Sequence, residues 1–290
     1  MKVLAAALIT VVLWGASPVA AKIAVSSLSP MMVAILRTVI GGLIALPLAI
    51  LLRIPLPADK AQRRLLALSG FCGFVAFPVL FTLGILHTSA NHASMILAGL
   101  PVFTGLIAMT WDRKQPSAAW WIGCTIAMTG EVLLIFGQDF DSATGASISG
   151  DLLVLSSNVF ASLGYVAGGR LERNGYPAMG TTFYGVSLYA LVLLPLLFIV
   201  EPGTPMLEVP TGIWIAIAYL AIGVTIVGYV LWYWALGRGG IARIALLQFL
   251  QPVSGVILAA ILLDEDFGAI FIAASGVILF GVWYALRANR

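Results

Sequence analysis

Long apolar runs separated by short polar stretches dominate the pattern of the chain. A transmembrane helix needs roughly 20 apolar residues, and ten runs approach or exceed that length. Since each run ends in polar or turn-forming residues, the pattern predicts separate helices rather than strands. We expect helices at residues 3–25, 31–52, 65–86, 92–111, 119–137, 151–169, 178–200, 212–236, 241–263 and 267–286. The predicted fold class is therefore all-α, a polytopic membrane protein with ten transmembrane helices.

The beginning of the first run has a second interpretation. Lys2 followed by an apolar stretch and a small-residue segment near residue 20 also fits a signal peptide. A multi-pass membrane protein needs no cleavage there, so we interpret this run as an uncleaved first helix.

Composition excludes a soluble globular protein. Hydrophobic residues make up 61% of the 290 residues and charged residues 9%, against roughly 45–50% and about 25% in soluble domains. Twenty-seven charged side chains, 15 basic and 12 acidic, cannot cover a water-exposed surface of this size. The mean hydropathy of +1.06 likewise predicts a lipid bilayer as the surroundings.

The basic residues indicate an orientation. If the N-terminus is cytoplasmic, alternate loops and both termini carry 13 of the 15 basic residues, as the positive-inside rule requires. Acidic residues fill the opposite loops. We therefore expect both termini in the cytoplasm of a cell with the chain in its inner (plasma) membrane, and no nucleic-acid partner despite a pI near 9.0. The 13 are Lys2, Arg53, Lys60, Arg63, Arg64, Arg113, Lys114, Arg170, Arg173, Arg238, Arg243, Arg287 and Arg290.

Ten helices divide into two sets of five, and a weak internal repeat supports this division. Shifting residues 70–137 by 151 positions places Gly130 on Gly281 and Pro101 on Pro252. We expect a first repeat at 1–137, an external linker at 138–150 and a second repeat at 151–290. An odd number of helices per repeat makes the second one inverted, and inverted repeats are typical of alternating-access transporters with a midplane substrate site.

A spaced motif adds a family resemblance. Trp14-Gly15, Lys22, Pro30 and Arg37 resemble the start of EamA-type members of the drug/metabolite transporter (DMT) superfamily, most closely the aromatic amino-acid exporter branch. The resemblance implies export, with helices 1, 3, 4, 6, 8 and 9 around a central cavity and helices 2, 5, 7 and 10 outside. The second half departs from this motif, since Ala161-Ser162 stands where Trp-Gly would be.

Depth along each predicted helix selects the candidate substrate-binding residues. Aromatic rings with amides and hydroxyls suit a flat, zwitterionic guest, and Gln248 and Gln251 are three apart and so share a helical face. The alternatives are plain aromatic packing, proline kinks and amides that join helices. The candidates are Trp14, Ser17, Phe77, Phe81, Met95, Pro101, Asn158, Tyr165, Tyr229, Gln248, Gln251 and Ser254.

The remaining ionisable residues suggest no second site. Lys22 and Arg37 are expected to extend toward the outer ends of their helices, which leaves no deep cation and disfavours phosphorylated substrates. Glu131 lies within helix 5, where a structural role is favoured over proton coupling. His87 and His92 are too poorly spaced, and too isolated from other ligands, for a metal site.

These patterns favour a secondary transporter that exports small organic metabolites, most of all aromatic or other neutral amino acids. The alternative is a multidrug or cationic-compound exporter of the same family. An intramembrane enzyme is remote, because no catalytic Ser/His or Asp/Asp pair lies at depth. No Walker A loop and no cofactor motif is present. The sequence leaves the exact substrate, the energy source and the oligomeric state open, a monomer included.

Overall fold

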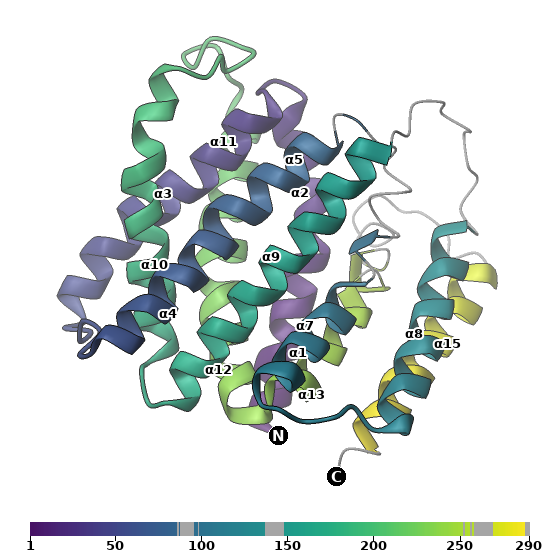
Figure 1. The fold of residues 1–290 in the computed structure, drawn as a ribbon. Helices are drawn as coiled ribbons and strands as arrows, with labels where there is room; N and C mark the ends of the chain where they lie inside the picture. The colour runs from purple at the N-terminus through teal and green to yellow at the C-terminus, as the bar shows by residue number, and fades with distance from the viewer. Residues whose placement is uncertain are drawn as a thin grey trace.

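A computed structural model describes residues 1–85, 87, 96–97, 99–136, 148–251, 253–255, 257 and 269–287. In this part of the chain the regular structure is helical, apart from one isolated bridge between Leu28 and Gly203. The helices form a bundle, and α8 and α15 stand together at one side of it (Figure 1). The all-α fold class is confirmed for the described residues.

The helices fall within or close to the ranges predicted from hydropathy. Among the described residues, five continuous helical segments are long and apolar enough to cross a membrane: Pro30–Leu51, Lys60–Phe81, Ile148–Arg173, Ala178–Phe198 and Thr211–Gly239. The count of ten transmembrane helices stays a prediction. The elements are α1 (Lys2–Gly15), α2 (Ser17–Val25), α3 (Pro30–Leu51), α4 (Lys60–Phe71), η1 (Cys72–Ala76), α5 (Phe77–Ile85), α7 (Leu100–Trp111), α8 (Ala118–Phe136), α9 (Ile148–Arg173), α10 (Ala178–Leu193), η2 (Leu194–Phe198), α11 (Thr211–Ala218), η3 (Tyr219–Gly228), α12 (Tyr229–Gly239), α13 (Ile241–Ala245), η4 (Leu246–Leu250) and α15 (Ala269–Arg287).

Three prolines within the apolar runs stand near the start of a helical element, although Pro78 also lies inside the continuous helical segment Lys60–Phe81. Pro18, Pro78 and Pro101 are each the second residue of α2, α5 and α7. Proline has no N–H to donate, and its ring clashes with the carbonyl four residues earlier, so the preceding turn must open. At the start of a helix that N–H would have no partner anyway. The fourth proline, Pro252, lies outside the described residues.

Two segments wind as π-helices, η1 and η3. A π-helix carries one extra residue per turn and leaves carbonyls that ordinary helical bonds do not reach. The 151-position shift predicted from the sequence carries Cys72–Ala76 onto residues 223–227, inside η3. Under this predicted shift, η1 coincides with part of η3.

Small residues bring neighbouring helices close together. On α3 and α10, Ser187 Oγ donates to the Gly42 carbonyl oxygen at 3.1 Å. On α8 and α15, a Cβ added at Gly281 would lie 2.5 Å from the Ala127 nitrogen. Backbones this close are typical of membrane helix pairs, whose association depends on van der Waals contact. The α3–α10 pair corresponds to predicted helices 2 and 7, and the α8–α15 pair corresponds to predicted helices 5 and 10.

Basic residues gather at one end of the bundle, which we call the basic end. The connections α3–α4, α7–α8, α9–α10 and α12–α13 lie there together with the start of α1 and the end of α15 (Figure 1). The α10–α11 connection, which carries Glu201 and Glu208, lies at the opposite end. The basic residues of these segments are Lys2, Arg53, Lys60, Arg63, Arg64, Arg113, Lys114, Arg170, Arg173, Arg238, Arg243 and Arg287.

Candidate functional site

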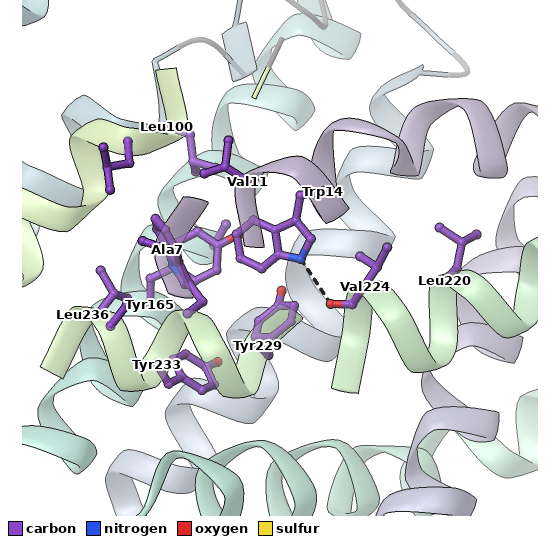
Figure 2. Packing of buried hydrophobic residues seen from close by; sticks show 14 of the residues in the cluster. Ala7, Val11, Trp14, Leu100, Tyr165, Leu220, Val224, Tyr229, Tyr233 and Leu236 are labelled. Carbon is purple, nitrogen blue, oxygen red and sulfur yellow. Dashed lines mark hydrogen bonds between the residues drawn. The ribbon is translucent and has the colours of Figure 1, made fainter. Parts of the chain in front are cut away.

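An aromatic cluster joins α1, α9 and α12 in the interior of the bundle (Figure 2). The Trp14 ring stacks on Tyr165, with centroids 5.5 Å apart and planes at 18°. It also lies 5.3 Å from the Tyr229 ring, which in turn packs 4.8 Å from Phe74. Trp14, Tyr165 and Tyr229 are each less than 5% exposed. The structure therefore brings together three of the predicted site residues.

Two polar groups of this cluster donate to carbonyls of the π-helices, while Nε1 of the adjacent Trp232 has no partner among the described residues. Trp14 Nε1 donates to the Val224 carbonyl of η3 at 3.1 Å (Figure 2). The Tyr229 hydroxyl donates to the Gly73 carbonyl of η1 at 3.3 Å. Ser69 Oγ donates to the hydroxyl oxygen of Tyr233 at 2.9 Å. The cluster thus satisfies carbonyls that π-helical winding leaves free, and its hydrogen bonds tie α1 to η3 and α12 to η1.

Arg37 corrects the sequence prediction. Its Nη2 donates to Thr225 Oγ1 at 3.2 Å, and Thr225 is buried near the middle of the segment Thr211–Gly239. The side chain therefore lies inward against η3 and does not extend to the outer end of its helix. The rotation of α3 against η3 and α10 decides this direction, and hydropathy along one helix does not reveal it.

This position places a cation beside the aromatic cluster. Thr225 directly follows Val224, whose carbonyl binds Trp14. No carboxylate of the described residues pairs with Arg37. The expectation that no deep cation exists is wrong, so it no longer disfavours phosphorylated substrates.

Gly15 places α1 directly against the segment that follows η4. A Cβ added at Gly15 would lie 2.1 Å from Ser254 Oγ and 2.9 Å from the Gly255 nitrogen. Ser254 Oγ lies within hydrogen-bonding distance of both the Val11 carbonyl, at 3.2 Å, and the Gln251 carbonyl, at 2.8 Å. The Trp-Gly pair of the motif therefore has two functions. Trp14 packs toward α12, while Gly15 leaves room for Ser254.

Two buried amides have polar atoms without a partner. Gln248, on η4, is 3% exposed, and neither its Nε2 nor its Oε1 has a partner in the described part of the chain. Asn158 of α9 donates to the Ile96 carbonyl, but its Oδ1 is unpaired. Gln251 is half-buried. The alternative that Gln248 joins two helices by a hydrogen bond finds no support in this geometry.

The other predicted site residues lie in different surroundings. Ser17 Oγ donates to the Trp14 carbonyl at 2.7 Å, which turns its hydroxyl toward its own backbone. Phe77 and Phe81 stack on each other at 5.7 Å. Pro101 is buried in the first turn of α7. Met95 lies outside the described residues.

Glu131 and the histidines complete the sequence predictions. Glu131 is 1% exposed on α8, and its Oε2 has no partner among the described residues. Arg37 donates to Thr225, and no ion pair between Arg37 and Glu131 is found among the described residues. His92 lies outside the described residues. The described residues contain no cluster of three or more His, Cys, Asp or Glu side chains suited to a metal ion.

Comparison with known proteins identifies the family. The EamA-like transporter family matches residues 1–136 and, separately, residues 148–287. The chain belongs to the EamA-like transporter family. It is therefore a multi-pass membrane transporter of small molecules rather than an enzyme, in agreement with the sequence prediction.

Relatives of this transporter cover nearly its whole length. An uncharacterized transporter of Bacillus subtilis, YdeK, is 31% identical over 285 residues, which cover 96% of this chain and 95% of that protein. A probable amino-acid metabolite efflux pump of Escherichia coli is 25% identical over 284 residues, with 96% and 92% covered. A crystal structure with 18% sequence identity shares the fold at a TM-score of 0.81, covering 99% of this chain and 96% of that one.

Proposed function

We propose that this transporter exports aromatic or other neutral amino acids by alternating access, with its basic end on the cytoplasmic face of the inner membrane. The observation that carries the proposal is the guanidinium of Arg37 beside the Trp14–Tyr165–Tyr229 cluster. A guanidinium offers paired N–H donors that match the two oxygens of a carboxylate. The cluster next to it presents apolar ring faces.

The unpaired amide of Gln248 supports a zwitterionic guest. An amide offers both an acceptor and two donors, so Oε1 would accept from an ammonium group while Nε2 would donate to a neutral oxygen. A buried amide without a partner is destabilising by about 1–3 kcal/mol. The presence of this unpaired amide on η4 therefore favours a binding site in which the ligand supplies the missing hydrogen-bond partners. Ser254, which is bonded to α1 across Gly15, lies six residues further along the same segment.

Alternating access rests on the relation between the two halves. The family matches the chain twice, over ranges close to the two proposed repeats at 1–137 and 151–290. The two π-helices η1 and η3 occur at corresponding positions of these repeats. Irregular helices where repeats meet are typical of secondary transporters, since such segments change conformation at modest cost. Export is supported by the printed name of the E. coli relative.

The alternative, a multidrug or cationic-compound exporter, is disfavoured by Arg37. A cationic guest beside an unneutralised guanidinium would experience repulsion in a medium of low dielectric constant. A carboxylate at the same place would be attracted. The charge of the guest near Arg37 therefore discriminates between the two candidates.

The proposal is tested by exchange in reconstituted liposomes. Vesicles preloaded with phenylalanine should take up labelled phenylalanine, and external compounds should compete according to their charged groups. Tryptophan and leucine should compete. Phenethylamine, which lacks the carboxylate, and phenylpropionate, which lacks the ammonium group, should compete at least about tenfold more weakly, since a hydrogen bond to a charged group contributes about 1.5–3 kcal/mol.

Variants that each remove one positive charge test whether Arg37 binds the substrate. Arg37→Gln should reduce phenylalanine exchange at least about tenfold, while Arg64→Gln, which removes an exposed guanidinium on α4, should leave it unchanged. Competition by phenethylamine equal to that of phenylalanine would favour the cationic-compound exporter. Strong competition by glucose 6-phosphate alone would contradict an amino-acid substrate.

A further inference from the structure

A cavity lies at the basic end, lined by none of the residues of the aromatic cluster. It has a volume of about 440 Å³ and opens between the end of α7 and the start of α8. Arg113, Lys114 and Gln115 contribute polar groups to its lining, while Met109 and Trp121 contribute apolar surface. No step of amino-acid transport uses these residues.

Neither cation of this cavity forms an ion pair in the described part of the chain, although the charge of Lys114 also acts on the nearby Asp112. Asp112 precedes them, but it binds Arg173, whose Nη1 lies 2.9 Å from Asp112 Oδ2, and also Arg170. The hydrogen bond from Arg173 lowers the pKa of Asp112 below its ordinary value, so this carboxylate stays ionised and bound to α9. No ion pair with Arg113 or Lys114 is found in the described part of the chain.

Helix dipoles do not determine whether the electrostatic potential in the cavity is positive or negative. The carboxyl end of α7 and the amino end of α8 both border it, and their opposite partial charges offset each other. The side chains of Arg113 and Lys114 therefore determine the potential, and the cavity is an anion site by charge.

The surroundings fit a lipid rather than a soluble anion. The cavity combines a cationic mouth with Met109 and the partly exposed ring of Trp121, and tryptophan is typical of the headgroup level of a bilayer. Basic pockets between helices on the cytoplasmic side attract anionic headgroups. We propose that this cavity binds the phosphate-bearing headgroup of an anionic phospholipid.

The backbone conformation at Arg113 allows a substitution that removes the charge without straining the backbone. Arg113 lies two residues after the end of α7 and has φ 53°, in the left-handed region, and Lys114 N donates to the Met109 carbonyl at 2.8 Å. Glycine adopts this conformation without strain, so Arg113→Gly removes the guanidinium and suits the fold. Arg53 likewise lies two residues after the end of α3, with φ 51°, at the same end of the bundle and outside the lining of this cavity. Arg53→Gly is therefore a matched control.

Native mass spectrometry of the purified transporter tests the proposal with dioleoylphosphatidylglycerol and dioleoylphosphatidylcholine. We expect the wild type and Arg53→Gly to bind phosphatidylglycerol equally and more tightly than phosphatidylcholine. Arg113→Gly should weaken phosphatidylglycerol binding about fivefold, and Arg113→Gly with Lys114→Gln about thirtyfold, at roughly one surface charge each. A melting curve for each variant verifies folding, and Lys114→Gln alone gives a second single-charge variant.

Three outcomes would overturn the proposal. The first is equal binding of the two lipids by the wild type. The second is an equal loss of binding in Arg53→Gly and Arg113→Gly, which would reflect overall charge. The third is displacement of the lipid by millimolar inorganic phosphate, which would assign the cavity to a soluble anion. Amino-acid exchange is not measured in this experiment, so failure of one proposal is distinguishable from failure of the other.

Discussion

The surroundings of Trp14 and those of Gln248 are both buried and both contain polar atoms, but they differ in how those atoms are paired. Around Trp14 most are bonded, although Nε1 of the neighbouring Trp232, whose ring lies 5.3 Å from Trp14, has no partner among the described residues. Trp14 donates to Val224, Tyr229 to Gly73, and the Tyr233 hydroxyl accepts from Ser69. The Gln248 amide has no partner among the described residues. Since an unpaired buried amide is destabilising, the comparison separates groups that hold the helices together from a group that is available to a ligand.

The largest expected effect is at Gly15, where the two regions meet. Gly15→Ala places a Cβ within 3 Å of the Gly255 nitrogen as well as of Ser254 Oγ, so α1 must move away from the segment after η4. Overpacking of this kind destabilises by about 1–3 kcal/mol. We expect a lower melting temperature in detergent and at least a tenfold loss of exchange, since about 1.4 kcal/mol corresponds to a factor of ten.

The matched control is Gly276→Ala on α15. A Cβ at Gly276 would meet no atom within 4 Å, so stability should remain or rise slightly, because alanine favours helix over glycine. Equal losses in the two variants would show that the contact at Gly15 is unimportant.

A smaller effect is expected for Trp14→Phe. The phenyl ring can still stack on Tyr165, but the hydrogen bond to the Val224 carbonyl is lost. Removing one partner of a buried hydrogen bond in a membrane protein is destabilising by about 1–2 kcal/mol. The melting temperature should fall, whereas Trp283→Phe, at a half-exposed ring on α15, should leave it unchanged. An unchanged melting temperature for Trp14→Phe would show that this hydrogen bond does not stabilise the fold.

The smallest effect is expected for Glu131→Gln. This carboxyl is also buried with an unpaired atom, but it lies on α8, and Val282 stands at the corresponding position of the second half. A group required by both halves would recur, so exchange should proceed at a near-normal rate. Loss of the response to a pH gradient, with substrate binding intact, would show instead that Glu131 carries the proton.

Hydropathy and charge predict much of this fold. The helices follow the apolar runs, and the basic residues mark one end of the bundle, because lipid and the positive-inside rule act on composition rather than on detailed packing. The π-helices η1 and η3 are not predictable in this way, since one inserted residue barely changes hydropathy. Pro78, the second residue of α5 directly after η1, is a local signal for η1 only.

The candidate site is predictable in part. Trp14, Tyr165 and Tyr229 meet because depth along separate helices brings large side chains to a common level. Arg37 was misplaced, because the depth of a Cα does not show where a long side chain extends once its helix is rotated against a neighbour. The family motif contains Arg37 and is the signal that would have pointed to it.

The most direct test of the account measures stability and transport together in Gln248→Leu. Leucine removes two unpaired polar atoms from a buried position. The account predicts that the melting temperature stays the same or rises while phenylalanine exchange falls at least about tenfold, the reverse of the stability effect of Trp14→Phe. A lower melting temperature with exchange retained would show that the amide stabilises the fold, and it would contradict the assignment of Gln248 to substrate.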